Sequence, residues 1–309
     1  MTTVDVHATS CAICLTKGNA SELYPANFSP DDFSPAVFSA RRVPDRIHYR
    51  MVRCNTCGLV RSDPVPDSSF VAALYRESTF DYSGEVENLS RTYGDYLARL
   101  DRYGVSKNAL LEIGCGNGFF LAQASRQGFK DVRGVEPSEA AIRLASDQIR
   151  QNITCAMMGP GLFPHESFDV VCLFQVLDHI FDPGSLLDTC FQILKPDGFV
   201  LCLNHNIEAL SARLLKHRSP IIDIEHTYLY SPETLGRLFS KSGFQIKECA
   251  GVRNRYSLNY LLRLVPSPRT LKETVLKIAN GTGLARLSCA VPLGNLYVIA
   301  QKPSSGVEA

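Results

Sequence analysis

The octapeptide LEIGCGNG, residues 111–118, decides the fold of this 309-residue chain. The apolar residues 109–113 predict a buried strand, and the pattern after residue 117 predicts a helix. Glycines permit a tight turn between the two elements, and their missing Cβ atoms leave room for a ligand across the strand end. Because dinucleotide-binding proteins use a similar turn for a pyrophosphate, the turn alone does not identify the ligand.

Outward from this turn, helical and strand patterns alternate along the chain. Strands are predicted at 131–136, 169–174, 198–204, 244–249 and 295–300. Helices are predicted at 86–103, 117–127, 138–149, 183–194 and 207–217, and a further helix begins at 231–233. This alternation indicates a doubly wound α/β sheet.

Four segments together resemble the successive motifs of class I S-adenosylmethionine-dependent methyltransferases. They are LLEIGCGNG (110–118), GVEPS (134–138), SFDVVCLFQVLDHIFDP (167–183) and LKPDGFV (194–200). The resemblance covers residues 105–250 and the last strand. It implies a Rossmann-like α/β fold with a seven-stranded sheet whose last strand is antiparallel, and S-adenosyl-L-methionine as the methyl donor.

The same resemblance assigns residues to the cofactor. The glycine turn packs against the methionine part, Glu136 binds the ribose hydroxyls, and the end of the fourth strand lies beneath the cofactor. Many relatives carry an acid that contacts adenine where this chain has Met157 and Met158, so we expect apolar and backbone contacts there. The assigned residues are Glu112, Gly114, Cys115, Gly116, Gly118, Glu136, Pro137, Met157, Met158, Phe174 and Gln175.

Two Cys-x-x-Cys pairs, Cys11/Cys14 and Cys54/Cys57, stand near the N-terminus. Four thiolates in tetrahedral geometry are what structural zinc prefers, and a loop-rich segment of this size needs such a staple. A labile dithiol pair and an iron–sulfur cluster remain open. We expect the other seven cysteines to be core residues: Cys115, Cys155, Cys172, Cys190, Cys202, Cys249 and Cys289.

The segment RCNTCGLVRSDPVP (53–66) is similar to zinc-binding segments that precede bacterial sugar-modifying methyltransferases. We therefore expect a zinc-binding module at 1–66, with a proline-rich linker at 62–67, and a helical linker or lid at 67–104. The methyltransferase domain follows at 105–303, with a basic helical insertion at about 252–288, and 304–309 form a disordered tail.

Three histidines follow predicted strand ends, where the acceptor of the methyl group is expected. A hydroxyl or carbon acceptor needs a base, and imidazole titrates near neutrality. His226 and His179 are the candidate bases, ahead of His205, and a structural hydrogen bond is the alternative role for each. The fourth strand lacks the Asn/Asp-Pro-Pro-Tyr/Phe sequence of enzymes that methylate base amines, which disfavours nucleic acid as acceptor.

The net charge is only +1, but basic residues are concentrated in some segments. In 252–288 they are Arg253, Arg255, Arg263, Arg269, Lys272, Lys277 and Arg286, against Glu273 alone. Solvated helix faces explain such a segment equally well as a basic rim that binds an anionic acceptor. The helix at 257–265 could also rest on a membrane surface.

The chain begins without a secretory signal and has no apolar stretch long enough to span a membrane, so we expect a cytoplasmic protein. The first functional hypothesis is methyl transfer to a small molecule or glycan, such as a nucleotide-linked sugar. The second is an RNA methyltransferase whose zinc module binds the nucleic acid. The third is a non-catalytic, cofactor-binding partner subunit. The sequence does not indicate an oligomeric state.

Overall fold

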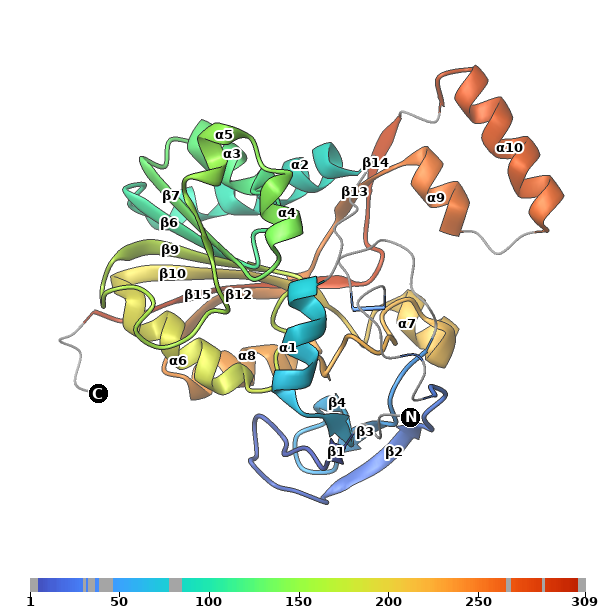
Figure 1. Ribbon diagram of the computed structural model, residues 1–309, viewed down its shortest axis with the longest axis horizontal. Helices are drawn as coiled ribbons and strands as arrows, with labels where there is room; N and C mark the ends of the chain where they lie inside the picture. Colours follow the sequence, from blue (N-terminus) through green and yellow to red (C-terminus); the bar gives the residue numbers. More distant parts are fainter. Residues whose placement is uncertain are drawn as a thin grey trace.

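Figure 1 shows the computed structural model, which describes residues 5–29, 32, 37–38, 47–77, 85–264, 268–284 and 287–304. Its largest sheet has seven strands in the order β12-β15-β10-β9-β6-β7-β8. The strands are β6 (Ala109–Ile113), β7 (Asp131–Glu136), β8 (Ile153–Cys155), β9 (Phe168–Phe174), β10 (Leu194–His205), β12 (Gln245–Gly251) and β15 (Asn295–Gln301). The last strand, β15, is antiparallel to both its neighbours, whereas β6 to β10 are parallel. The predicted fold class is confirmed.

The central strand β9 is buried along its whole length, because helices cover both faces of the sheet. Val171 and Leu173 pack toward α6 (Pro183–Ile193) and α8 (Pro232–Lys241). Val170 and Phe174 pack toward α2 (Val86–Leu97) and α3 (Phe119–Arg126) on the other face (Figure 1). Because successive side chains of a strand point to opposite faces, this one apolar run contributes to a hydrophobic core on each face of the sheet.

Two predicted helices are shorter than expected. The stretch 138–149 holds α4 (Glu139–Arg143) and α5 (Asp147–Arg150), and the strand β8 that follows was not predicted. The stretch 207–217 holds α7 (Leu210–Leu215) and the 3₁₀ turn η3 (Lys216–Arg218). Lys216, with φ of 52°, leaves helical geometry and ends α7.

The N-terminal segment forms small sheets that join the methyltransferase region directly. β1 (Val6–His7) pairs with β5 (Val65–Pro66). β2 (Ala20–Tyr24), β3 (Met51–Cys54) and β4 (Val60–Ser62) form a second sheet, in which β4 also pairs with β11 (Tyr228–Leu229). The predicted linker at 62–67 is therefore wrong, because Ser62 ends β4, and Val65 and Pro66 form the buried edge strand β5, where proline is tolerated. The module and the methyltransferase region also share one hydrophobic core.

Helix α1 (Ser68–Glu77) leads out of the module and crosses in front of the large sheet (Figure 1). α2 continues into the 3₁₀ helix η2 (Ala98–Tyr103), as the sequence predicted for 86–103. Residues 78–84, between α1 and α2, lie outside the described part of the chain.

The insertion after β12 is a hairpin that carries two helices. β13 (Asn254–Ser257) pairs with β14 (Ser288–Val291), and α9 (Leu258–Leu264) and α10 (Arg269–Gly281) project from the body (Figure 1). The sequence predicted only mixed helices there. Among the described helices, none combines the length and apolar character that crossing a bilayer demands. The predicted tail lies outside the described residues from 305 onward.

Candidate functional site

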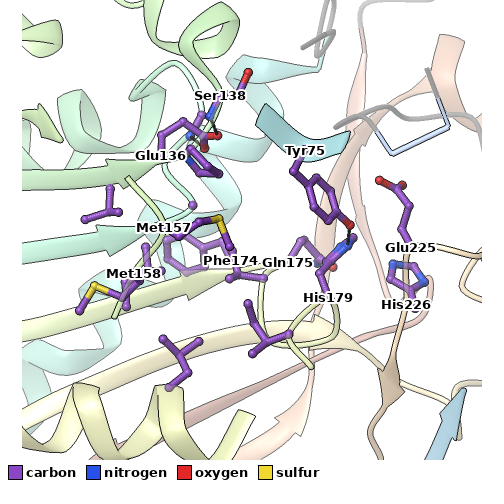
Figure 2. Close-up of a pocket in the computed structure, with 18 of the residues that line it drawn as sticks. Tyr75, Glu136, Ser138, Met157, Met158, Phe174, Gln175, His179, Glu225 and His226 are labelled. Carbon is purple, nitrogen blue, oxygen red and sulfur yellow. Dashed lines mark hydrogen bonds between the residues drawn. The ribbon is translucent and has the colours of Figure 1, made fainter. Parts of the chain in front are cut away.

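A cavity of about 570 Å³ opens at the carboxyl ends of β6, β7, β9 and β10. Helix α1 forms its opposite wall through Val71, Ala72 and Tyr75. In Figure 2, Glu136 and Ser138 stand at one end, Tyr75, His179 and His226 at the other, and Phe174 and Gln175 between them. Most of the predicted cofactor residues and the three predicted histidines thus line one cavity.

The glycine turn after β6 has a backbone that other residues rarely adopt. Gly114, Gly116 and Gly118 have φ values of 71°, 55° and 70°. A Cβ on Gly114 would lie 2.5 Å from a methyl group of Val176, and one on Gly118 would lie 2.4 Å from a methyl group of Ile149. The turn therefore needs glycine both for conformation and for space.

Glu136 is fixed at the end of β7 by backbone amides. Its Oε2 accepts a hydrogen bond from Gly116 N at 2.8 Å, and its Oε1 accepts one from Ser138 N at 2.9 Å. Burial raises the pKa of Glu136, although these two hydrogen bonds oppose the rise. The carboxylate keeps lone pairs for the two hydroxyls of a ribose.

Most of the other predicted cofactor residues also line the cavity. Pro137, Met157, Met158, Phe174 and Gln175 do so. The Oε1 atom of Gln175 is buried and has no hydrogen-bond partner within the described chain, so a donor of a bound ligand can satisfy it. The glycine cradle, the fixed carboxylate and this orphan oxygen fit S-adenosyl-L-methionine.

Three predicted cofactor residues lie behind the lining instead. Glu112, Cys115 and Gly118 are absent from the described wall of the cavity. Glu112 and Cys115 are 3% and 2% exposed, and the sulfur of Cys115 packs against Gly134. Burial, and then the nearby Glu136, raise the pKa of Glu112 well above its usual range. These residues support the turn from beneath.

The three histidines converge from three separate segments. His179 follows β9, His205 ends β10, and His226 precedes β11. The ring centroids of His179 and His226 are 4.8 Å apart, and those of His205 and His226 are 4.5 Å apart. All three line the cavity, as the sequence predicted for this end of the sheet.

Asp178, which the sequence analysis did not single out, lies beneath this cluster with no exposed surface. Its Oδ2 accepts a hydrogen bond from His205 Nδ1 at 2.6 Å, with Nδ1 assigned as the donor. Its Oδ1 lies 3.7 Å from His179 Nε2 and has no hydrogen-bond partner among the described residues. Asp178 could not be selected from the VLDH motif alone, because only the fold brings His205 next to it.

The Nδ1 atoms of His226 and His179 contact groups that lie outside the histidine cluster. His226 Nδ1 lies 2.9 Å from the carbonyl oxygen of Ile221, and His179 Nδ1 lies 2.8 Å from the hydroxyl of Tyr75 (Figure 2). Tyr75 comes from α1, which the sequence analysis treated only as a linker or lid. These contacts fix the orientation of both rings.

Burial sets the charge states of the cluster. It lowers the pKa of His179 to about 3 against the opposing field of Asp178, and burial followed by His205 lowers the pKa of His226. Burial alone would raise the pKa of Asp178, but His179 and His205 hold it well below its usual range. At neutral pH, His179 and His226 are therefore neutral, Asp178 is ionised, and His179 is a weak proton acceptor.

The described wall of the cavity contains neither lysine nor arginine. Arg255 forms an ion pair with Asp95 at 3.0 Å, and Arg253 donates to the carbonyl of Ala290 at 3.3 Å. The predicted basic rim is therefore not found at these two positions. Arg286, also assigned to the rim, lies outside the described residues.

The four N-terminal cysteines form a second site. The sulfurs of Cys11, Cys14, Cys54 and Cys57 lie within 4.8 Å of one another, with Cys11 and Cys57 3.4 Å apart. Tetrahedral zinc with Zn–S bonds of about 2.3 Å separates its sulfurs by about 3.8 Å, so the four thiols fit this ion. Burial opposes ionisation of Cys54, but the amides of Cys57 and Thr56 lower its pKa to about 7.

Two of the other cysteines depart from the prediction. Cys115, Cys172, Cys190 and Cys202 are buried, and Cys249 is half-buried, whereas Cys155 and Cys289 are exposed. Cys155 ends the short edge strand β8, and Cys289 lies in the projecting hairpin, so neither belongs to the core.

The cysteine module holds the acceptor end of the cavity in place. Lys241 of α8 donates to the carbonyls of Ala12 and Ile13 at 3.2 and 2.9 Å. Ser62 of β4 donates to the carbonyl of His226 at 2.8 Å. The module therefore positions a cavity histidine through the strand β4.

Comparisons with known proteins place this chain among methyltransferases. A family model described as a methyltransferase domain matches residues 86–248. A ubiquinone biosynthesis O-methyltransferase of Caulobacter vibrioides is 35% identical over 131 residues, which are 37% of this chain and half of that relative. The enzyme of the same name from Pseudomonas fluorescens is 27% identical over 194 residues, 57% of this chain and 79% of the relative. A solved methyltransferase from Archaeoglobus fulgidus is 22% identical, with 72% of this chain and 100% of that chain covered and a TM-score of 0.46.

Proposed function

Since this chain belongs to the methyltransferase domain family and is an S-adenosylmethionine-dependent methyltransferase, we propose that it methylates a hydroxyl group of a small molecule. One observation supports this proposal best. A single cavity is lined by Glu136 at one end and, at the other, by His205, which is hydrogen-bonded to Asp178. The relatives in Caulobacter vibrioides and Pseudomonas fluorescens are O-methyltransferases of ubiquinone biosynthesis, which supports oxygen as the accepting atom.

The residues of the chain divide the work between the two ends of the cavity. S-adenosyl-L-methionine, when bound, supplies a methyl group already activated on a sulfonium sulfur. Gly114, Gly116 and Glu136 hold the donor, and α1 forms the opposite wall of the cavity. Alignment of the acceptor oxygen with the methyl group is the main contribution that such a displacement needs.

The proton of the acceptor goes to His205 in this proposal. Its Nδ1 donates to the ionised Asp178, so Nε2 is left to accept the hydroxyl proton, and the carboxylate stabilises the imidazolium that forms. The sequence favoured His226 and His179. Their lowered pKa values, caused first by burial, make both weaker bases than an ordinary histidine.

The lining supports a neutral acceptor with an apolar or aromatic part. Tyr256 and Tyr260 stack with centroids 4.9 Å apart and line the cavity together with Val71 and Ile180. A nucleotide-linked sugar or glycan stays the narrower prediction from the sequence, and the acids Asp223 and Glu225 in the wall weigh against its anionic part. The RNA alternative is weakened because the cysteine module is docked on the methyltransferase core.

We further propose that Cys11, Cys14, Cys54 and Cys57 hold one structural zinc ion, on the basis of their mutual distances. Such a closed four-thiolate site stabilises its module and offers no open position for chemistry. Metal analysis of the native protein tests this assignment: about one zinc per chain that persists through dialysis is expected, and iron with sulfide would contradict it.

The methyl transfer is tested by release of S-adenosylhomocysteine with a panel of hydroxyl, amine, carbon and RNA acceptors. We expect turnover with small hydroxyl compounds. His205→Ala should lower kcat about 10²- to 10⁴-fold without changing the affinity for S-adenosylmethionine, whereas the exposed His165→Ala should have no effect. Turnover only with RNA or amines, or full activity of His205→Ala, would overturn the proposal.

A further inference from the structure

Asp178, His179 and His226 form a second potential metal site, separate from the four cysteines. One donor atom from each lies within 4.8 Å of the others, and no ion is part of the structure. We propose that these three residues bind a divalent cation at the acceptor end of the cavity, and that the acceptor chelates it through two neighbouring oxygens. This inference rests on the proposed function and names the substrate class, a vicinal diol or its enol equivalent.

The donor spacing fits a transition-metal ion. Metal–nitrogen and metal–oxygen bonds of about 2.0–2.2 Å place tetrahedral ligands about 3.4 Å apart. Asp178 Oδ1 and His179 Nε2 are 3.7 Å apart, and the widest donor separation allowed by the group is 4.8 Å. A donor pair at that limit has to approach by about 1.4 Å to reach the tetrahedral separation, whereas Asp178 Oδ1 and His179 Nε2 are within about 0.3 Å of it.

The outer hydrogen bonds are those that metal-binding histidines make. A ligating histidine donates its other ring N–H to a carbonyl, carboxylate or water, which fixes the tautomer that leaves a lone pair for the metal. Because a carbonyl oxygen only accepts, the 2.9 Å contact with Ile221 places the proton of His226 on Nδ1 and leaves Nε2 with its lone pair. The hydroxyl of Tyr75, which can donate or accept, lies 2.8 Å from His179 Nδ1, and Nε2 of the same ring lies 3.7 Å from Asp178 Oδ1.

One oxygen of the buried Asp178 carboxylate is left without a hydrogen-bond partner in the described chain. The residue is fully buried, its Oδ1 has no hydrogen-bond partner in the described chain, and no described lysine or arginine pairs with it. His205 satisfies only Oδ2, and a buried carboxylate whose second oxygen lacks a partner is costly; metal coordination is one way in which proteins resolve this. Asp223 and Glu225, which line the same end of the cavity, add negative potential that favours a cation.

Two histidines and one carboxylate leave coordination positions open, unlike the closed cysteine site. Three protein ligands leave one open position on a tetrahedral ion, but at least two on a five- or six-coordinate ion, where a diol can occupy two neighbouring positions. The cation then lowers the pKa of the bound hydroxyl. The hydroxyl proton passes to His205 Nε2. The oxygen electron pair forms the new C–O bond while the methyl–sulfur bond breaks, and its electrons remain on sulfur as S-adenosylhomocysteine forms.

Cobalt substitution of the full-length protein tests the inference, because the absorption spectrum of Co²⁺ depends on which ligands bind it. Wild type should bind two equivalents of Co²⁺, one with the strong ultraviolet thiolate absorption of the cysteine site and one without it. Asp178→Asn and His226→Ala should each bind one equivalent and keep the thiolate absorption, and the exposed His165→Ala should still bind two. Addition of catechol, but not phenol, should change the visible spectrum of the second cobalt.

One equivalent in wild type, or two equivalents in both site variants, would overturn the cation site. Retained binding of S-adenosylhomocysteine shows that a variant is folded, and His179→Ala provides a third test at a partly exposed residue. Turnover that survives with one equivalent of metal would refute the cation and leave the proposed function standing. Two equivalents of bound metal without any methyl transfer would support the cation site and contradict the proposed function.

Discussion

Glu136 is oriented before any ligand arrives, because two backbone amides hold its carboxylate at the cavity wall. Glu136→Gln should weaken S-adenosylmethionine binding about 10- to 100-fold, the effect of losing hydrogen bonds to a charged group worth about 1.5–3 kcal/mol. Burial raises the pKa of this acid, and the ionised form is the one that binds. The affinity of wild type should therefore fall on acidification from a higher pH than for an ordinary glutamate.

Calorimetric titrations between pH 5 and pH 8 measure this dependence. Glu139→Gln, at an exposed position in the first turn of α4, is the matched control and should behave like wild type. Equal pH profiles for wild type and Glu136→Gln would show that another group controls the binding.

Glu112 carries a carboxyl group that folding forces into its neutral form. Its pKa is raised well above the usual 4.5, first by burial and then by Glu136, so above the unfolded pKa the unfolded state releases a proton that the folded state keeps. Stability is thus fully present below about pH 4.5 and is lost as pH rises toward the folded pKa, by up to about 1.4 kcal/mol per pH unit. Glu112→Gln should remove this loss and be more stable than wild type at pH 8.

Urea unfolding of both proteins at pH 5, 6.5 and 8 measures the difference. A variant whose unfolding free energy falls in parallel with that of wild type would contradict the assignment of this loss to Glu112.

Single residues could be predicted where the reason for them is local. Gly114 and Glu136 stand at fixed places around one turn, so the sequence alone could select them, and both line the cavity. The Asp178–His205 and Tyr75–His179 contacts join residues 27 and 104 positions apart, and the chain pattern carries no signal for such pairs. The predicted bases His226 and His179 line the cavity, but the contact between His205 and Asp178 was not predicted.

At the scale of elements, helix α1 connects the cysteine module with the acceptor end of the cavity. Its Tyr75 fixes the ring of His179 through a 2.8 Å hydrogen bond. Tyr75→Phe should lower kcat/KM for the acceptor about 10- to 100-fold, as supporting contacts of this kind usually do, and should leave the affinity for S-adenosylmethionine unchanged.

Steady-state kinetics with the best hydroxyl acceptor, together with cofactor titration, separates the two effects. Tyr24→Phe, which alters a tyrosine of β2 outside the cavity wall, is the control. A change in cofactor affinity alone would place the influence of α1 at the wrong end of the cavity.

Elements were predictable where they are long and periodic. β9 and α6 match their predicted ranges within one residue, because an apolar run and a helical stripe need no distant partner to be seen. The three-residue strand β8, the proline-containing β5 and the hairpin β13–β14 are stabilised by pairing with strands elsewhere. The sequences of these strands are too short or too polar to predict a strand by themselves.

At the scale of the whole molecule, the cysteine module and the methyltransferase region form one folding unit. Cys11, Cys54 and Leu59 lie in the same hydrophobic core as Leu186 and Tyr228. Removal of the proposed zinc ion should therefore lower the melting temperature of the entire chain, by about 2–4 °C for each kcal/mol lost, in one transition.

Differential scanning calorimetry before and after strong chelation, with zinc added back as control, checks this expectation. The same shift in Asp178→Asn would assign it to the cysteine site. Two separate transitions, of which only the smaller responds to chelation, would show that the module is an independent appendage.

The central claim is that the glycine turn and Glu136 bind an adenosyl sulfonium donor. Titration calorimetry of the purified chain with S-adenosylhomocysteine tests it most directly. We predict one molecule bound per chain, with affinity reduced by Glu136→Gln and unaffected by His205→Ala. No uptake of this ligand, or displacement of it by a nicotinamide dinucleotide, would contradict the account.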